Sequence, residues 1–151
     1  MSVQASIEIG LSKYPQDYKS PIELLKILLH GGWTLNDHGG ISYLPIGDND
    51  DFDWVIQAQI SQNELMQILE EKEQKNERIG IVLTWQETNI GGSFMFESSN
   101  EISISLTINR KIVCGENSFK MTDGNWYLLR LLPLFHENNI KVCSFTFEEL
   151  A

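Results

Sequence analysis

The densest group of charged side chains is an acidic cluster in the first half of the chain. It consists of four aspartates within six positions: Asp48, Asp50, Asp51 and Asp53. Carboxylates this close repel one another, so the cluster favours exposure to water, to a cation or to a basic partner. A calcium loop is not expected, because Phe52 occupies a ligand position and neither the turn glycine nor the distal glutamate follows. The cluster predicts a solvated acidic loop or a docking surface for a basic protein.

Other residues extend this predicted docking surface. Three more acids lie at the end of a predicted helix: Glu70, Glu71 and Glu73. The segment 70–75 is wholly polar and lacks the apolar spacing of a coiled coil, so we expect it in solvent. Trp54 and Tyr43 lie near the aspartates and would supply aromatic anchors, in which binding energy concentrates. The candidate partner-binding residues are Asp48, Asp50, Asp51, Asp53, Glu70, Glu71 and Glu73.

Histidine and cysteine residues form no catalytic or metal-binding pattern. The histidines, His30, His38 and His136, are not paired at helical spacing, and no Cys-x-x-Cys occurs. His30 and His136 fall near predicted helix C-termini, where a partly charged imidazole suits the dipole. Cys114 and Cys143 are expected to be reduced, buried thiols. We expect no catalytic, cofactor-binding or metal-binding residue.

Glycine motifs for phosphate binding or nucleophilic catalysis are also missing from the sequence. Gly31-Gly32 follows a predicted helix, and Gly39-Gly40 and Gly91-Gly92 fall in predicted hairpin turns, so none opens onto a helix N-terminus. No Gly-x-Ser-x-Gly elbow occurs. The chain is therefore expected not to be an enzyme.

Net charge narrows the classes of partner. The 151 residues include 11 Lys or Arg and 21 Asp or Glu, which gives a formal charge of −10. This acidity argues against nucleic acids and anionic membranes, since both need a cationic surface. Residues 1–75 carry a net −7 and residues 76–151 a net −3. A partner selected by charge is therefore basic and meets the first half, unless the acidity only maintains solubility.

The sequence predicts a cytoplasmic protein. The N-terminus lacks a basic segment followed by an apolar core and a cleavage site, so no signal peptide is expected. The longest apolar patch, 126–135, is about half as long as a bilayer crossing and contains Arg130 and Pro133.

Alternating apolar residues predict the centre of the fold. Three such runs follow one another over about 79–109, with apolar side chains at every second position, which is typical of an antiparallel meander. The intervening residues of the third run are Ser103, Ser105, Thr107 and Asn109, so the second sheet face is expected in water. Helices must then cover the first face.

Three helices are expected to do so, over about 21–30, 62–75 and 124–136. Ser20 and Ser61 begin capping boxes, and Thr122 or Asp123 caps the third helix, which Pro133 is expected to kink or end. Six further extended segments are predicted: strand 3–11, a hairpin of 33–35 with 41–44, strand 52–60, a short strand or extension at 110–114, and strand 140–147. Residues 115–121 are expected to be a loop. The predicted fold is a single α+β domain over 1–151.

An acidic α+β domain of this size without catalytic motifs resembles the immunity proteins of bacterial polymorphic toxin and contact-dependent growth inhibition systems. The resemblance rests on length, charge and the meander-plus-helices layout, and it carries over no individual residue. It implies a one-to-one complex with a cognate toxin domain, often a basic nuclease, whose active site or an essential surface is blocked. Two alternatives remain: a regulatory or structural module that forms a homo-oligomer through apolar sheet surface, and an enzyme whose site is assembled from distant residues.

Overall fold

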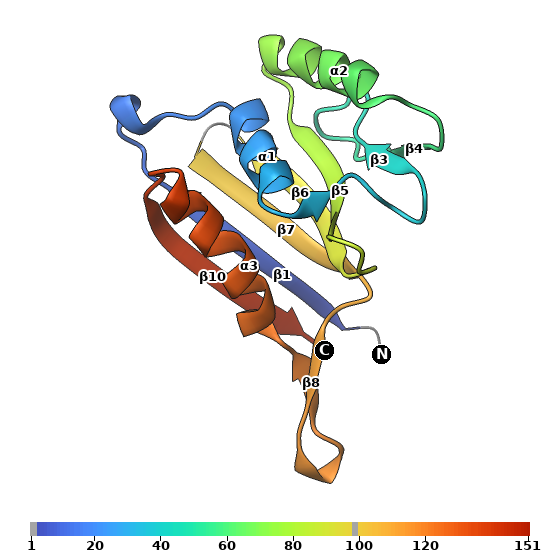
Figure 1. Ribbon diagram of the computed structural model, residues 1–151, viewed down its shortest axis with the longest axis vertical. Helices are drawn as coiled ribbons and strands as arrows, with labels where there is room; N and C mark the ends of the chain where they lie inside the picture. The colour runs from blue at the N-terminus through green and yellow to red at the C-terminus, as the bar shows by residue number, and fades with distance from the viewer. Residues whose placement is uncertain (1–2, 98–99) are drawn as a thin grey trace.

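The structure, a computed structural model, describes residues 3–97 and 100–151, so residues 98 and 99 of the predicted meander lie outside the described part. An antiparallel sheet of eight strands forms its centre, in the order β10-β1-β7-β6-β5-β3-β4, with β2 also paired to β5 (Figure 1). Its strands are β1 (Gln4–Leu11), β2 (Trp33–Thr34), β3 (Ile41–Tyr43), β4 (Val55–Gln57), β5 (Ile79–Trp85), β6 (Gly91–Glu97), β7 (Glu101–Ile108) and β10 (Val142–Leu150). The predicted single α+β domain with a central meander is confirmed.

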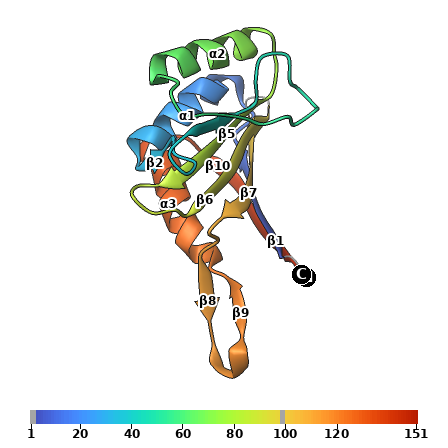
Figure 2. The same cartoon turned by 90° about the vertical axis from the view of Figure 1, so that its right-hand side faces the viewer.

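Three helices contact the sheet, as predicted. They are α1 (Pro21–His30), α2 (Gln62–Gln74) and α3 (Gly124–Glu137). In Figure 2, α1 and α3 lie on one side of the sheet, and α2 lies at the end where β5 begins. The hydroxyl oxygens of Ser20 and Ser61 accept the backbone N–H groups of Glu23 and Glu64, at 3.2 and 3.1 Å. Asp123 caps α3. These caps satisfy amides that otherwise lack partners in the first turn of a helix.

The predicted third helix over about 124–136 is confirmed, because α3 continues to Glu137. Of the two alternatives for Pro133, a kink or an end, the end of the helix is therefore wrong. Proline lacks the N–H that would bind the carbonyl four residues earlier, here that of Leu129. Leu129 is 57 % exposed and Pro133 is exposed too, so this side of the helix faces solvent. Water can therefore hydrogen-bond to the Leu129 carbonyl, and the helix tolerates the lost backbone bond.

The core follows the predicted alternation. Buried side chains of β5, β6 and β7 point toward the helices: Ile79, Ile81, Leu83, Phe94, Phe96, Ile102, Ile104 and Leu106. β5 departs from the expectation of one wet face, because Val82 and Thr84 are buried as well. The Thr84 hydroxyl donates to the carbonyl oxygen of Asn36 at 3.0 Å. The segment after β2 therefore also covers this part of the second sheet face.

Two predicted strand arrangements are wrong. The predicted turn between 33–35 and 41–44 is present, with an antiparallel bridge between Asp37 and Gly40 and positive φ at Gly39. The two strands do not pair with each other, however, because β2 and β3 both pair with β5. Of the predicted strand 52–60, only β4 is extended, and Phe52 adopts a left-handed conformation with a φ of 54°. The acidic residues just before β4 determine that local conformation, as described below.

The predicted turn at Gly91-Gly92 is also wrong, since both glycines begin β6. A Cβ atom on Gly91 would overlap the backbone of Leu83, and one on Gly92 would overlap the backbone of Ser105. Glycine is needed here for the close approach of neighbouring backbones rather than for a turn.

A second, two-stranded sheet projects from the end of the molecule opposite α2 (Figures 1 and 2). It pairs β8 (Ile112–Cys114) with β9 (Lys120–Thr122), and Glu116–Ser118 forms a short 3-10 turn at its tip. The prediction of a loop over 115–121 is therefore wrong in part. Cys114 and Cys143 are free and exposed, which contradicts their predicted burial, because both lie on strands whose outward sides face solvent. No described helix has the length and apolar character needed to cross a membrane.

Candidate functional site

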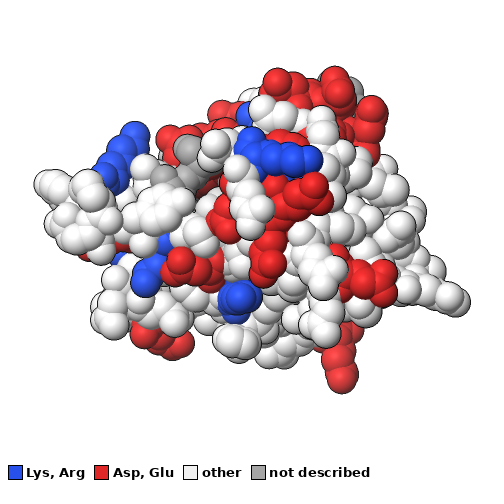
Figure 3. Space-filling view, turned by 90° about the horizontal axis from the view of Figure 1, so that it is seen from above, with Lys and Arg blue, Asp and Glu red and all other residues white. Residues whose placement is uncertain are grey.

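The predicted partner-binding residues lie on a loop and on the adjacent helix α2, at the end of the molecule away from the β8–β9 hairpin. We call residues 44–54, which connect β3 to β4, the acidic loop. Asp50, Asp51 and Asp53 are exposed there, as predicted. Figure 3 shows the molecule from above, where acidic side chains gather around a smaller number of basic ones. The loop therefore presents carboxylates to solvent on a surface of mixed but mainly negative charge.

Asp48 does not belong to this exposed set, contrary to the prediction. Its side chain is buried and accepts the backbone N–H groups of Asp51, Phe52 and Asp53, at 3.0, 3.0 and 2.7 Å. Burial by itself would raise the pKa of Asp48, but these three amides and the charge of Lys72 outweigh it and hold the pKa below its ordinary value. Asp48 therefore shapes the loop from inside and leaves its neighbours facing outward.

Lys72 supports the same loop from helix α2. The prediction that segment 70–75 is wholly solvated is wrong at this residue, which is fully buried. Its Nζ donates to the carbonyl oxygens of Pro45 and Asp48, both at 2.7 Å. Burial lowers the pKa of Lys72, and the carboxylates of Glu77 and Asp48 partly oppose that shift. A buried cation beneath the acidic loop is consistent with a fixed rather than a mobile loop.

Arg78 directly precedes β5 and connects the acidic loop to the sheet through side-chain contacts. Its guanidinium contacts Glu97 of β6 at 3.2 Å and Asp50 at 3.6 Å, and it donates to the carbonyl oxygen of Asn49 at 2.9 Å. The guanidinium carbon also lies 5.2 Å from the centre of the Phe52 ring. Arg78 therefore neutralises part of the local negative charge, while the Asp50 side chain stays 80 % exposed.

Apolar side chains are exposed between the acids of this region. Phe52 is 46 % exposed and Ile56 60 %, and Ile46 and Trp54 are exposed to lesser extents. The expectation of Trp54 as an accessible aromatic group is met, but Tyr43 is buried and its hydroxyl donates to Gln57 at 3.0 Å. Acidic and aromatic side chains thus alternate on the outside of one fixed loop.

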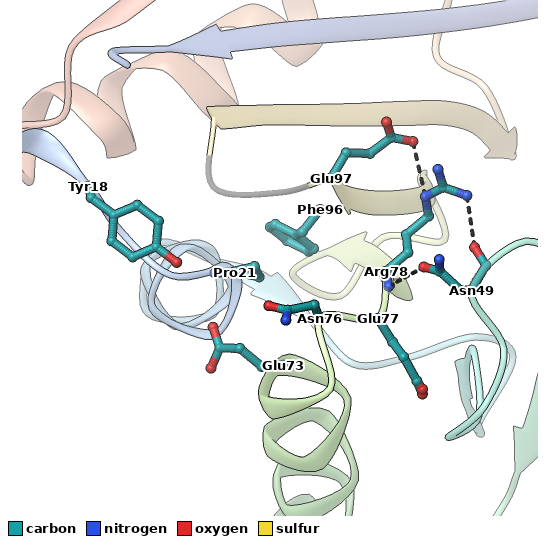
Figure 4. A pocket seen from close by; sticks show the side chains of 9 residues that line it. All are labelled: Tyr18, Pro21, Asn49, Glu73, Asn76, Glu77, Arg78, Phe96 and Glu97. Atoms are coloured by element: carbon teal, nitrogen blue, oxygen red, sulfur yellow. Dashed lines mark hydrogen bonds and ion pairs between the residues drawn. The ribbon is translucent and has the colours of Figure 1, made fainter. Parts of the chain in front are cut away.

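A pocket of about 460 Å³ adjoins the acidic loop. It is lined by Tyr18, Pro21, Asn49, Glu73, Asn76, Glu77, Arg78, Phe96 and Glu97. Figure 4 shows Tyr18 and Arg78 on opposite sides of the pocket, with Phe96 between them. Three of these residues are acidic and one is basic, so the lining has a formal charge of −2. Its polar lining and negative charge suit a positively charged group.

Glu73 is the member of this lining with an unfilled hydrogen-bonding position. Its Oε1 atom is buried and has no partner among the described residues. The other two acids are engaged, because Glu77 accepts the N–H of Gly47 at 2.6 Å and Glu97 pairs with Arg78. A buried carboxylate oxygen without a donor is costly. A cationic or amide group entering the pocket would satisfy it.

The remaining predicted residues lie outside the pocket. Glu70 is exposed on α2, and Glu71 forms an exposed ion pair with Lys75 at 3.1 Å. Residues that prediction missed are Tyr18, Glu77, Arg78 and Glu97, which the chain brings together from three separate segments. The sequence did contain one signal for such residues, the charged pair Glu77-Arg78 directly before an apolar run. Charged residues that flank a strand lie at the edge of its sheet, where they can line a surface pocket.

The described residues offer no arrangement for metal or nucleophilic chemistry at this site. No histidine or cysteine lines the pocket, and no group of three or more His, Cys, Asp or Glu side chains within 3–97 and 100–151 is placed to hold a metal ion. Comparison of the chain with protein-family models, with curated proteins and with solved structures gives no match. What the site does must be inferred from its residues.

Proposed function

We propose that the protein is an immunity or inhibitor protein, which binds a cognate basic toxin domain one-to-one and neutralises it. The observation that supports this function best is the fixed acidic loop, on which Asp50, Asp51 and Asp53 alternate with exposed Phe52 and Trp54. Acidic groups attract and orient a basic partner, while aromatic side chains at the centre of an interface contribute most of its affinity.

The pocket beside the loop extends the proposed interface. A lysine or arginine of the partner would enter between Tyr18 and Arg78 and reach Glu73 Oε1, which has no donor within the described part of the chain. If the toxin is a nuclease, the outward carboxylates would occupy positions that substrate phosphates take in its cationic cleft. Blocking that cleft requires no catalytic residue in the inhibitor.

Fixing the loop in advance favours tight binding. Asp48 and Lys72 hold the loop through five hydrogen bonds between buried groups and loop backbone atoms. A surface that is already ordered loses little conformational entropy when it binds. The exposed side chains can therefore meet the partner with most of the binding energy retained.

The test is binding to the product of the adjacent gene, measured by co-purification and by association kinetics at several salt concentrations. Asp50→Lys with Asp51→Lys should lower the association rate by about tenfold or more and weaken its salt dependence. Glu87→Lys with Glu137→Lys changes the net charge equally at exposed positions outside the loop and is the matched control.

The proposal fails if the purified chain ignores the neighbouring basic protein, or if both pairs of reversals have the same effect on binding. Glu73→Gln provides a second test inside the pocket, with Glu87→Gln, at an exposed position outside the proposed interface, as its control. Loss of affinity in Glu73→Gln alone is expected.

A further inference from the structure

The β8–β9 hairpin exposes an unusual amount of apolar surface. We call residues 110–122 the arm. Val113 and Met121 are paired across its two strands and are 46 % and 38 % exposed, and Ile112 and Phe119 are exposed as well. Figure 2 shows the arm standing away from the sheet and the helices, so nothing described in the chain covers it. Val113 and Met121 lie together on one face of the ribbon, while Ile112 points to the other, and exposed apolar surface of this kind marks an interaction site.

The root of the arm is fastened to the body of the protein. The N–H of Lys111 donates to the hydroxyl of buried Tyr127 at 2.9 Å, and the N–H of Asp123 donates to the Lys111 carbonyl at 2.9 Å. On the other strand, the N–H of Thr122 donates to Glu149 Oε1 at 2.9 Å, and its hydroxyl donates to the same atom. An isolated two-stranded ribbon is only marginally stable, so this anchoring holds the arm in place away from the body.

The charge of the arm is opposite to that of the remaining chain. The arm contains three of the 11 basic residues, Arg110, Lys111 and Lys120, and one of the 21 acidic residues, Glu116. Its formal charge is therefore +2, while the rest of the chain carries −12. The basic partner proposed above would be repelled by such an arm, whereas a second copy of this acidic chain would attract it.

A hollow of about 670 Å³ lies beside the root of the arm and is suited to receive it. Its lining includes Ala5, Leu106, Arg110, Glu148 and Leu150 from the ends of β1, β7 and β10 and from the arm root. Glu148 and Arg110 are the charged members of this lining, which is therefore formally neutral, and Leu150 is an exposed apolar side chain. Apolar contact and an ion pair with Glu148 would hold an entering arm.

We propose that the arm is a dimerisation device, which lies in the hollow beside β10 of a second copy of the chain. The arm and the hollow adjoin on one molecule, because Arg110 belongs to both. A two-fold axis next to them would let each arm enter the other copy's hollow at once, which gives a closed dimer rather than an open chain of molecules. The acidic loops lie at the far ends and stay accessible in such a dimer.

The test is the mass of the purified full chain in sedimentation experiments over a range of concentrations, without any other protein. We expect a dimer, at twice the 17.3 kDa mass of one chain, whose affinity decreases as salt is raised. Val113→Ser with Met121→Ser should raise the dissociation constant by at least about tenfold, and Lys120→Glu should do the same through charge. Leu129→Ser with Ile56→Ser removes two exposed apolar side chains elsewhere and should leave the dimer intact.

Several outcomes would overturn this assignment. One is a monomer at every concentration up to about 100 µM, well above the dissociation constant of a stable dimer of ordinary interface size. Another is a dimer that is weakened by the control pair and not by the arm variants. A monomer whose arm variants instead lose affinity for the basic partner would assign the arm to that partner. Because the sedimentation experiments use the chain alone, their outcome does not depend on the proposed inhibition.

Discussion

The two ends of this molecule expose apolar side chains in opposite electrostatic settings. The acidic loop surrounds Phe52 and Trp54 with carboxylates, whereas the arm places Val113, Phe119 and Met121 among basic residues. The way each is held also differs. A buried lysine and a buried aspartate support the loop from within, whereas a tyrosine hydroxyl and a glutamate anchor the arm only at its root.

Under our two proposals, one small domain presents two separate recognition surfaces. The loop is anchored along much of its length, so its shape depends on buried polar contacts. The arm is anchored at its base alone, so its outer residues depend on whatever covers them. Substitution of Asp48 or Lys72 should therefore lower the stability of the whole fold. Substitution of Tyr127 or Glu149 should mainly loosen the arm.

The largest effect on stability is expected from Lys72→Met. Removing the Nζ donor leaves the carbonyl oxygens of Pro45 and Asp48 without their partner, at a cost of about 1–3 kcal/mol in the free energy of unfolding. The control is Lys75→Met, which removes an exposed ion pair worth less than about 1 kcal/mol. Urea unfolding measures both. Equal losses in the two variants would mean that Lys72 does not support the loop as described.

A smaller and more local effect is expected from Tyr127→Phe at the root of the arm. Loss of the hydroxyl leaves the Lys111 N–H without its acceptor and should cost about 0.5–1.5 kcal/mol. Limited trypsin digestion reports the local change, because loosening of the root should speed cleavage after Arg110 and Lys111. Tyr14→Phe removes a phenolic hydroxyl from an exposed residue and should change neither measurement. Unchanged cleavage in Tyr127→Phe would contradict the anchoring role.

The smallest effect on stability is expected on acidification, and it should involve both the acidic loop and the root of the arm. The pKa of Asp48 is lowered as described, and the pKa of Glu149 is lowered by the hydroxyl and N–H of Thr122 and by Arg110, against burial. A carboxyl group whose folded pKa is depressed stabilises the fold above its unfolded pKa of about 4, and that contribution is lost as pH falls through the folded value.

Urea midpoints measured between about pH 2 and pH 5 test this expectation, since acid destabilisation in this window follows such groups. Asp48→Asn and Glu149→Gln should each be less stable than the wild type at neutral pH, and each should lose less stability on acidification. A pH dependence identical to that of the wild type in both variants would show that neither carboxylate is linked to folding.

Local sequence patterns were sufficient to predict the centre of the fold. The period of two in β5, β6 and β7 follows from which side chains face the helices, and Ser20, Ser61 and Asp123 mark the helix starts through contacts within three residues. Long-range pairing is not encoded in this way. That β2 and β3 both pair with β5 depends on residues about forty to fifty positions away, so the sequence favoured a local hairpin instead.

The site was predictable only in part for the same reason. Exposure of Asp50, Asp51 and Asp53 follows from charge repulsion between neighbours. Burial of Asp48 requires Lys72, which lies 24 residues further along the chain. The pocket joins Tyr18, Glu73 and Glu97, whose proximity exists only after folding. The arm was missed because its turn uses Asn117 and Ser118 at positive φ rather than a recognisable Asn-Gly or Asp-Gly pair.

The separation of the basic arm from the acidic loop gives the molecule an electric dipole along its long axis (Figure 1). In the field of a strongly positive object, a single chain should rotate until the loop end leads, before any contact is made. In the proposed dimer the two chain dipoles oppose each other, so this orientation belongs to the monomer alone. Productive collisions would then outnumber those expected from random tumbling. This bias would fade as ions screen the field over about 8 Å at physiological salt.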